Sequence, residues 1–170
     1  MTISKGEAAH VLNSAAKVLP ADQLARRLAD QPGKTVFTNG CFDLLHVGHV
    51  RYLQAARALG DRLVVGLNSD ASVQALKGPS RPIVSEEERA ELLAALACVD
   101  YVTVFADATA APLLEVLRPH IYAKGGDYTP DSLPEAPTVR AYGGEIAIVP
   151  FVPGRSTTDL VARIQAPERN

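Results

Sequence analysis

Apolar and polar positions along the chain follow two different periods, and the changes of period mark the expected elements. Short, nearly continuous apolar runs are typical of parallel strands, because both faces of such strands are buried. These runs predict strands over residues 34–39, 61–68, 100–105, 120–124 and 145–151. Longer stretches with apolar residues three or four apart indicate amphipathic helices. They predict helices over residues 4–30 (broken at Pro20), 47–59, 85–99, 108–119 and 156–164.

Strands and helices alternate along the whole chain, which predicts an α/β fold. We expect a Rossmann-like, doubly wound parallel sheet with helices on both of its faces. The segment over residues 125–137 is rich in Gly and Pro and is expected to be a long functional loop. The 170 residues suit one sizeable core, with a helical extension over residues 1–32 and the main domain over residues 33–170.

The composition argues against several classes of function. With a net charge of −2 and no Trp, the chain has neither the positive field nor the aromatic residues of a nucleic-acid-binding protein. No apolar stretch approaches the length of a membrane span, and the first residues do not resemble a secretory signal. We therefore expect a cytoplasmic protein that acts on small molecules, without nucleic-acid or membrane partners. Cys41 and Cys98 are far apart in the sequence and are expected to be reduced thiols.

The carboxyl ends of the predicted strands indicate where a ligand binds, because open parallel sheets hold ligands beyond those ends. This rule predicts a site lined by residues 38–43, 68–70, 105–107, 124–128 and 153–158. The first of these segments supplies the candidate nucleotide contacts Thr38, Asn39, Gly40, Cys41, Phe42 and Asp43.

His46 and His49 lie just after the first strand, where a helix is expected to begin. Free backbone N–H groups and the positive end of the helix dipole make such a place an anion site, and ring N–H groups add further donors. Gly48 between the histidines lets a phosphate approach the backbone. Two alternatives are a pair of partly buried helix-start residues and a metal site with Cys41 and Asp43. Zinc ligands usually come from separated elements, so we favour the anion site.

The segment GCFDLLHVGH, residues 40–49, resembles the HxGH signature of a nucleotidyltransferase superfamily. That superfamily includes the cytidylyltransferases, pantetheine-phosphate adenylyltransferase and the class I aminoacyl-tRNA synthetases. Further motifs resemble, in the same order, the adenylyltransferase domains of bacterial heptose 1-phosphate kinase/adenylyltransferases. They are LNSD (67–70), LKGPSRP (76–82), KGGDY (124–128), GGEI (143–146) and STT (156–158), and the resemblance covers about residues 33–166.

The resemblance implies a reaction in which a heptose 1-phosphate attacks the α-phosphorus of ATP, giving ADP-heptose and pyrophosphate. ATP would be the nucleotide substrate, with Mg²⁺ held mainly by phosphate oxygens and water. No direct protein ligand for Mg²⁺ is expected other than the candidate Asp43. The residues before the motifs are too few for a kinase, so we expect a monofunctional enzyme, supplied by a separate heptose kinase. The resemblance also implies a homodimer.

Such a reaction needs positioned charge rather than a base, because the attacking phosphate oxygen is already anionic. The resemblance places His46 and His49 at the transition state. Lys77, expected in a loop after the second strand, adds a point charge on phosphate. The acceptor sugar phosphate is expected to contact Asn68, Asp70 and Arg81, although Asp70 also suits a helix cap.

Two more segments are expected to bind the nucleotide. At the end of the fourth strand, the contacts are expected from Lys124, Gly125, Gly126 and Asp127, for which an ordinary glycine-rich turn is the alternative. At the start of the last helix, hydroxyl and backbone donors are expected from Ser156, Thr157 and Thr158. Helix capping alone would explain only one of these three hydroxyls.

Two other functions are compatible with parts of the pattern. A cytidylyltransferase that uses CTP with glycerol 3-phosphate or a phospho-alcohol shares the HxGH and STT motifs, whereas KGGDY and GGE favour the heptose branch. A non-catalytic nucleotide-binding module is the alternative from another class. The presence of His46, His49 and Lys77 argues against it.

Overall fold

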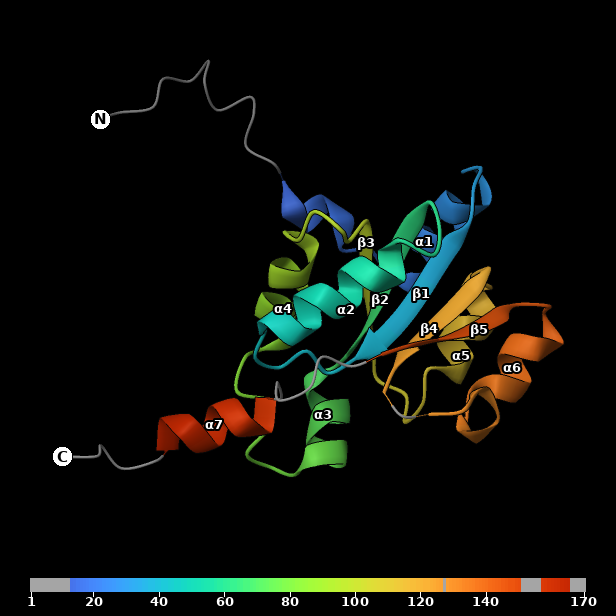
Figure 1. Ribbon diagram of the computed structural model, residues 1–170. Helices are drawn as coiled ribbons and strands as arrows, with labels where there is room; N and C mark the ends of the chain where they lie inside the picture. The colour runs from blue at the N-terminus through green and yellow to red at the C-terminus, as the bar shows by residue number, and fades with distance from the viewer. Residues whose placement is uncertain (1–12, 127, 151–156, 166–170) are drawn as a thin grey trace, which may run out of the picture.

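A computed structural model describes residues 13–126, 128–150 and 157–165. Its five strands form one sheet in the order β3-β2-β1-β4-β5, and every neighbouring pair is parallel (Figure 1). The strands are β1 (Thr35–Gly40), β2 (Arg62–Asn68), β3 (Tyr101–Phe105), β4 (Ile121–Gly125) and β5 (Glu145–Val149). The predicted parallel α/β sheet is confirmed, strand by strand.

Helices cover both faces of this sheet, as expected for a doubly wound fold. One face carries α2 (Val47–Arg57) and α4 (Glu86–Ala94). The other face carries α1 (Ala21–Ala29), α5 (Ala111–Leu117) and α6 (Ala136–Ala141). The remaining helices are α3 (Asp70–Lys77), α7 (Thr157–Gln165) and the short 3₁₀ helices η2 (Ser14–Lys17) and η3 (Pro130–Ser132). None of the helices in the described ranges is long and apolar enough to cross a bilayer.

Successive side chains along the strands point to opposite faces of the sheet and pack into two separate cores. Val36 and Val65 pack under α2 and α4, whereas Phe37 and Val64 pack under α1 and α5. All seven residues of β2 are buried, which explains its continuous apolar run. Burial of such side chains stabilises the fold by about 1.5–3 kcal/mol each. The two cores hold the strand ends rigidly, and the loops beyond those ends build the site.

Part of the predicted N-terminal extension belongs to the second core. Leu24 of α1 is fully buried beside Phe37, and the Leu19 N–H donates to the carbonyl of Val102 in β3 at 3.0 Å. Pro20 separates η2 from α1, as its position in the sequence predicted. The domain boundary at residue 32 stays a prediction, and residues 4–12 of the predicted helix lie outside the described residues.

Two helices were not predicted, and both lie next to the site. Lys77, expected in a loop, is the last residue of α3. The Ser69 hydroxyl begins this helix by accepting a hydrogen bond from the N–H of Ser72. The segment predicted as one long loop contains η3 and ends in the first turn of α6. The helix predicted over residues 85–99 is shorter, because α4 ends at Ala94.

Candidate active site

The direction of the chain across the sheet reverses between β1 and β4. Successive strands lead from β1 to β3 on one side and from β4 to β5 on the other. The crossovers therefore diverge, and in such sheets ligands bind at this switch point, beyond the carboxyl ends of the strands. The residues that end these two strands, Gly40 and Gly125, flank it.

Both of these glycines allow aromatic rings to pack against the backbone. A Cβ atom on Gly125 would lie 2.9 Å from the Cε2 atom of Tyr52, and one on Gly40 would lie 3.0 Å from the Cε2 atom of Phe42. The Tyr52 hydroxyl lies 2.6 Å from Oγ1 of the fully buried Thr38 and donates to the Ala123 carbonyl at 3.1 Å. Thr38 thus lies beneath the site, where it helps to tie α2 to β1 and β4.

His46 and His49 form a stacked pair at the start of α2. His46 occupies the N-cap position, and its Nδ1 atom accepts a hydrogen bond from the N–H of Gly48 at 3.1 Å. The two imidazole rings lie 3.9 Å apart between centroids, with 22° between their planes. Since Nδ1 of His46 is an acceptor here, the proton of the neutral ring is on Nε2, as a donor.

His49 has a more enclosed environment. Its ring contacts Phe42 edge-on, at 5.2 Å between centroids. Burial, followed by the charge of His46, lowers the pKa of His49 from 6.5 to about 4. Its Nδ1 atom is buried and makes no hydrogen bond among the described residues. His49 is therefore a neutral imidazole at pH 7 and can donate or accept one hydrogen bond without carrying charge.

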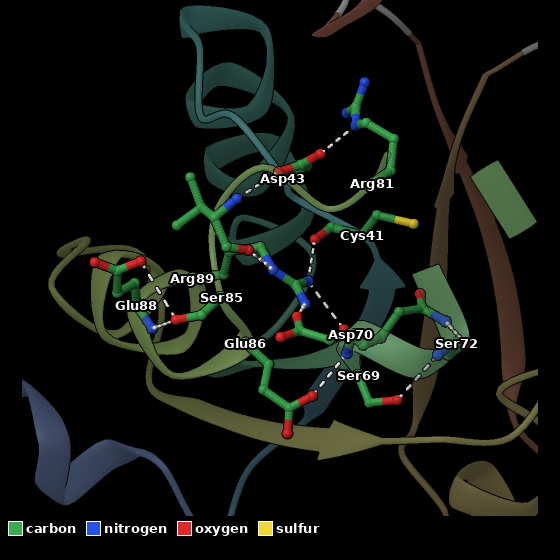
Figure 2. A network of polar contacts seen from close by, with 12 residues as sticks. Cys41, Asp43, Ser69, Asp70, Ser72, Arg81, Ser85, Glu86, Glu88 and Arg89 are labelled. Atoms are coloured by element: carbon green, nitrogen blue, oxygen red, sulfur yellow. Dashed lines mark hydrogen bonds and ion pairs between the residues drawn. The ribbon is translucent and has the colours of Figure 1, made fainter. Parts of the chain in front are cut away.

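Asp43 and Arg81, predicted for separate ligands, form an ion pair with each other. The Asp43 carboxylate is 3% exposed and accepts from Nε of Arg81 at 2.5 Å (Figure 2). Its other oxygen accepts from the N–H groups of Ile83 and Val84, at 2.7 and 3.1 Å. Asp43 therefore fastens the loop between α3 and α4 to the turn after β1. The guanidinium end of Arg81 points away from this pair.

Arg89 is a central residue of the site that the sequence analysis missed. Its side chain is fully buried and donates to the carbonyl oxygens of Cys41 and Asn68, at 2.6 and 2.9 Å. It also donates to the Val84 carbonyl at 2.9 Å and to the Asp70 carboxylate at 2.7 Å (Figure 2). One guanidinium thus joins the loops after β1 and β2 to α3 and α4.

A signal for Arg89 was present in the helical register. The buried positions of α4 are Arg89, Ala90, Leu93 and Ala94, so the arginine occupies the apolar face of the helix. The acidic first turn over residues 86–88 suits the positive end of the helix dipole. Within it, the Glu86 carboxylate also accepts from the N–H of Asp70 at 2.7 Å.

The predicted acceptor residues are held by contacts within the protein. The Asn68 amide donates to the Ser72 hydroxyl at 2.9 Å and is almost wholly buried. Asp70 pairs with Arg89, and 36% of its side chain is exposed. Lys77 is exposed at the end of α3, and its charge opposes the effect by which burial raises the pKa of the Cys41 thiol. The Lys77 charge therefore acts on the turn after β1.

Of the other predicted contacts, Lys124 and Gly126 lie on the β4 side of the switch point, and Thr157 lies near the segment after β1. Nζ of Lys124 donates to Oδ1 of Asn39 at 3.2 Å, which joins the ends of β4 and β1. Gly126 has a φ of 122° and donates to the Val149 carbonyl at 3.3 Å. Thr157 begins α7, and its hydroxyl donates to the Leu44 carbonyl at 3.4 Å. Asp127, Ser156 and the side chain of Thr158 lie outside the described residues.

Metal-ligating side chains do not converge in the part of the chain that the structure describes. No three His, Cys, Asp or Glu residues among the described positions are grouped to hold an ion. Cys41 and Cys98 are free thiols, and burial raises the pKa of both. Neither thiol is therefore activated as a nucleophile.

Comparison of the sequence with models of protein families agrees with this geometry. The sequence model of the cytidylyltransferase-like family matches residues 37–162, a span that includes most of β1, the stacked histidines, Arg89 and the start of α7. The chain belongs to this family. Membership confirms the predicted fold and the resemblance of the HxGH segment to the nucleotidyltransferases.

Individual relatives in this family are much longer than the chain. A bifunctional protein HldE of Syntrophotalea carbinolica is 62% identical over 133 residues, which cover 78% of this chain and 27% of that protein. One from Geobacter sulfurreducens is 55% identical over 152 residues, covering 88% and 31%. The chain therefore spans less than a third of the length of either relative. These similarities confirm the resemblance to the adenylyltransferase domain of the bifunctional heptose enzymes.

Solved structures show the same fold. A lipopolysaccharide core biosynthesis protein from Thermoplasma volcanium superposes with a TM-score of 0.58 at 29% identity, covering 71% of this chain and 98% of that one. Pantothenate synthetase from Thermus thermophilus superposes with a TM-score of 0.57 at 20% identity, covering 79% and 62%. The second match supports the arrangement of the sheet and helices alone.

Proposed function

We propose that the chain transfers the adenylyl group of ATP to D-glycero-β-D-manno-heptose 1-phosphate, giving ADP-heptose and pyrophosphate. The observation that carries this proposal is the stacked pair of His46 and His49 at the start of α2, beside the switch point of the sheet. The identity to HldE proteins and the name of the Thermoplasma neighbour support heptose chemistry in particular.

In the proposed reaction, a phosphate oxygen of the sugar attacks the α-phosphorus of ATP. The bond from that phosphorus to the β-phosphate bridging oxygen breaks, and pyrophosphate leaves with the electron pair. The attacking oxygen is already anionic, so no general base is required. Catalysis then depends on donors aimed at the charge on the α-phosphate and on the leaving group.

His46 and His49 are suited to this task as hydrogen-bond donors. Because Nδ1 of His46 accepts from the Gly48 N–H, Nε2 is the nitrogen of this ring that can donate. The lowered pKa of His49 keeps its ring neutral at pH 7, so phosphate recognition there uses a hydrogen bond rather than a full charge. Lys77 supplies the point charge, from the end of α3 on the opposite side.

We assign the two substrates to opposite sides of the switch point. We assign the nucleotide to the crevice between β1 and β4, near Asn39 and Lys124, with Asp127 and residues 156–158 as further predicted contacts. We assign the sugar phosphate to the side of β2 and α3, where Asp70 is partly exposed, with Arg81 of the loop after α3 as a further predicted contact.

Mg²⁺ fits this site as a companion of the nucleotide. Both oxygens of Asp43, the candidate direct ligand, already accept hydrogen bonds from the protein. The ion would therefore be held by the triphosphate and water, and when bound it offsets negative charge on the phosphates. We also propose that the protein is a cytoplasmic homodimer, and that a separate kinase activity supplies its sugar phosphate.

Release of pyrophosphate tests the function directly. ATP, CTP and GTP are each combined, with Mg²⁺, with heptose 1-phosphate and with glycerol 3-phosphate. Release with ATP and heptose 1-phosphate alone is the expected result. Release with CTP and glycerol 3-phosphate would identify a cytidylyltransferase of the same family instead. Nucleotide binding without any release would contradict both and favour a non-catalytic module.

A further inference from the structure

A buried polar cluster lies beneath the nucleotide side of the switch point, and the proposed reaction does not use it directly. Hydrogen bonds join Asn39 of β1 to Tyr122 and Lys124 of β4, and Glu135, at the N-cap of α6, lies close enough for its charge to act on Tyr122 and Lys124. These four residues form the cluster. Tyr122 is fully buried, and its hydroxyl donates to Oδ1 of Asn39 at 2.8 Å. Lys124 donates to the same oxygen at 3.2 Å. Asn39 is thus the end of the cluster that faces the crevice.

These two donors fix the orientation of the Asn39 amide. An ammonium group can only donate, so the Asn39 atom that contacts Lys124 is the oxygen and not the nitrogen. The Nδ2 atom is therefore directed away from Tyr122 and Lys124. Within the described ranges it donates to no protein acceptor, and Asn39 is only partly buried. Two N–H donors thus remain available at the carboxyl end of β1.

Glu135 is the acidic member of the cluster and is also buried. Its side chain is only 4% exposed, and Oε1 accepts from the N–H of Ala110 at 3.3 Å. Oε2 is buried and makes no well-formed hydrogen bond to any described residue. A carboxylate in such a place destabilises the fold unless neighbouring groups compensate it. Its position therefore calls for a role beyond packing.

The charge of Glu135 acts on Tyr122 and Lys124, the two residues of the cluster that lie in β4. Burial, and next the negative charge of Glu135, raise the pKa of Tyr122 above its usual value, which keeps the hydroxyl protonated as a donor to Asn39. Burial lowers the pKa of Lys124, and Glu135 opposes this effect, which favours the charged ammonium. The Lys124 ammonium also lies 5.8 Å from the centre of the Tyr122 ring.

We propose that Tyr122 and Glu135 are positioning residues for nucleotide binding: they hold Lys124 and the Asn39 amide so that an ammonium group and two N–H donors face the ATP phosphates between β1 and β4. This inference rests on the proposed function, and it names the residues that position the nucleotide-binding groups of the site. Neither residue touches the nucleotide. Each acts through Asn39 or Lys124, so its loss weakens ATP binding selectively and leaves the sugar phosphate side intact.

Two conservative variants test the proposal. Tyr122→Phe removes only the hydroxyl that contacts Asn39, and Glu135→Gln removes the charge but keeps the shape. Tyr142→Phe is the matched control, because it also removes a buried hydroxyl on the same side of the sheet, one without a hydrogen bond among the described residues. Circular dichroism and urea unfolding establish that each variant folds.

Binding of α,β-methylene-ATP with Mg²⁺ is then measured by calorimetry, and kcat and both KM values by pyrophosphate release. We expect Tyr122→Phe and Glu135→Gln to weaken analogue binding and raise the KM for ATP by about tenfold, as for loss of a hydrogen bond to a charged group. The KM for heptose 1-phosphate and kcat should stay within about twofold, and Tyr142→Phe should resemble the wild type.

Either of two results would overturn the proposal. One is unchanged analogue affinity in folded Tyr122→Phe, which decides the matter even if Glu135→Gln does not fold. The other is an equal loss for both substrates, as a merely structural role would produce. The binding measurement needs no turnover. A wild-type protein that binds the analogue but does not use heptose 1-phosphate would therefore refute the proposed function without touching this inference.

Discussion

The fully buried guanidinium of Arg89 donates to the carboxylate of Asp70 at 2.7 Å, and the same group donates to the main chain of the turn after β1 (Figure 2). The first strand ends in the histidine-bearing segment, and the second strand leads into the helix that ends at Lys77. A single side chain from α4 therefore sets the distance between the two halves of the site.

Replacement of Arg89 should destabilise the protein strongly. Arg89→Met leaves several buried acceptors unpaired, and breaking a buried pair in this way costs about 3–5 kcal/mol of unfolding free energy. We expect the lower end, about 3 kcal/mol, because the Asp70 partner is partly exposed to water. Urea unfolding measures the change. Arg26→Met is the control, since its pair with Asp22 is exposed and should contribute less than about 1 kcal/mol. Equal losses in the two variants would contradict this assignment.

The histidine pair should be required for turnover and not for folding. His46→Ala and His49→Ala each remove one donor at the start of α2, and loss of such a donor typically costs about 10²–10³ in kcat. Both side chains are partly exposed at the surface of the site, so we expect unfolding midpoints near that of the wild type. Pyrophosphate release under saturating substrates provides the measurement. A folded variant with an unchanged rate would remove that histidine from the catalytic residues.

His49 should also make stability depend on pH. Its pKa is about 4 in the folded protein against 6.5 for the ordinary group, so the unfolded chain binds a proton between these values that the folded chain does not. The free energy of unfolding therefore falls as the pH falls from 6.5 towards 4. Urea unfolding at several pH values should show a shallower fall for His49→Gln. Identical pH profiles for variant and wild type would mean that the imidazole is not protected from protonation.

How well the sequence predicts each helix or strand depends on how much of that element is buried. All seven residues of β2 are buried, and its apolar run located it for that reason. Apolar runs also located the other four strands, including β5, which is only partly buried. The helix predicted from residue 85 likewise begins there, because the Ser85 hydroxyl accepts from the N–H of Glu88 at the start of α4. By contrast, α3 buries only Ser72 and Val73, so it has no apolar stripe to mark it. α6 has six residues and contains Pro137, which suggested a loop.

The sequence predicted which segments form the site better than it predicted which side chains contact one another there. The strand-end rule located the turn after β1 and the start of α2, because topology alone brings these segments to one edge. It could not show that Asp43 pairs with Arg81, since 38 residues separate them and both types are also common phosphate-site residues. Arg89 was missed because its identity suggested an exposed helix position, although its register lies on the buried face.

Asp43 should position its neighbouring loop and not bind the metal ion. In Asp43→Asn the amide nitrogen replaces the oxygen that faces Nε of Arg81, so the contact becomes donor against donor. We expect a raised KM for the sugar phosphate and a loss of about 1–3 kcal/mol in stability. The Mg²⁺ concentration for half-maximal rate should stay the same. Restoration of the rate by excess Mg²⁺ would instead identify Asp43 as a metal ligand.

Lys77 should contribute charge to the reaction from its exposed position at the end of α3. Lys77→Met keeps most of the side chain and removes the ammonium, and we expect kcat/KM to fall by about 10–100-fold, less than for an enclosed donor because water screens the charge. The control is Lys34→Met, which removes an equally exposed ammonium just before β1, at the opposite edge of the sheet. That variant should match the wild type at low and high salt. If both variants lose activity equally, the effect arises from net charge, and Lys77 has no specific place in the site.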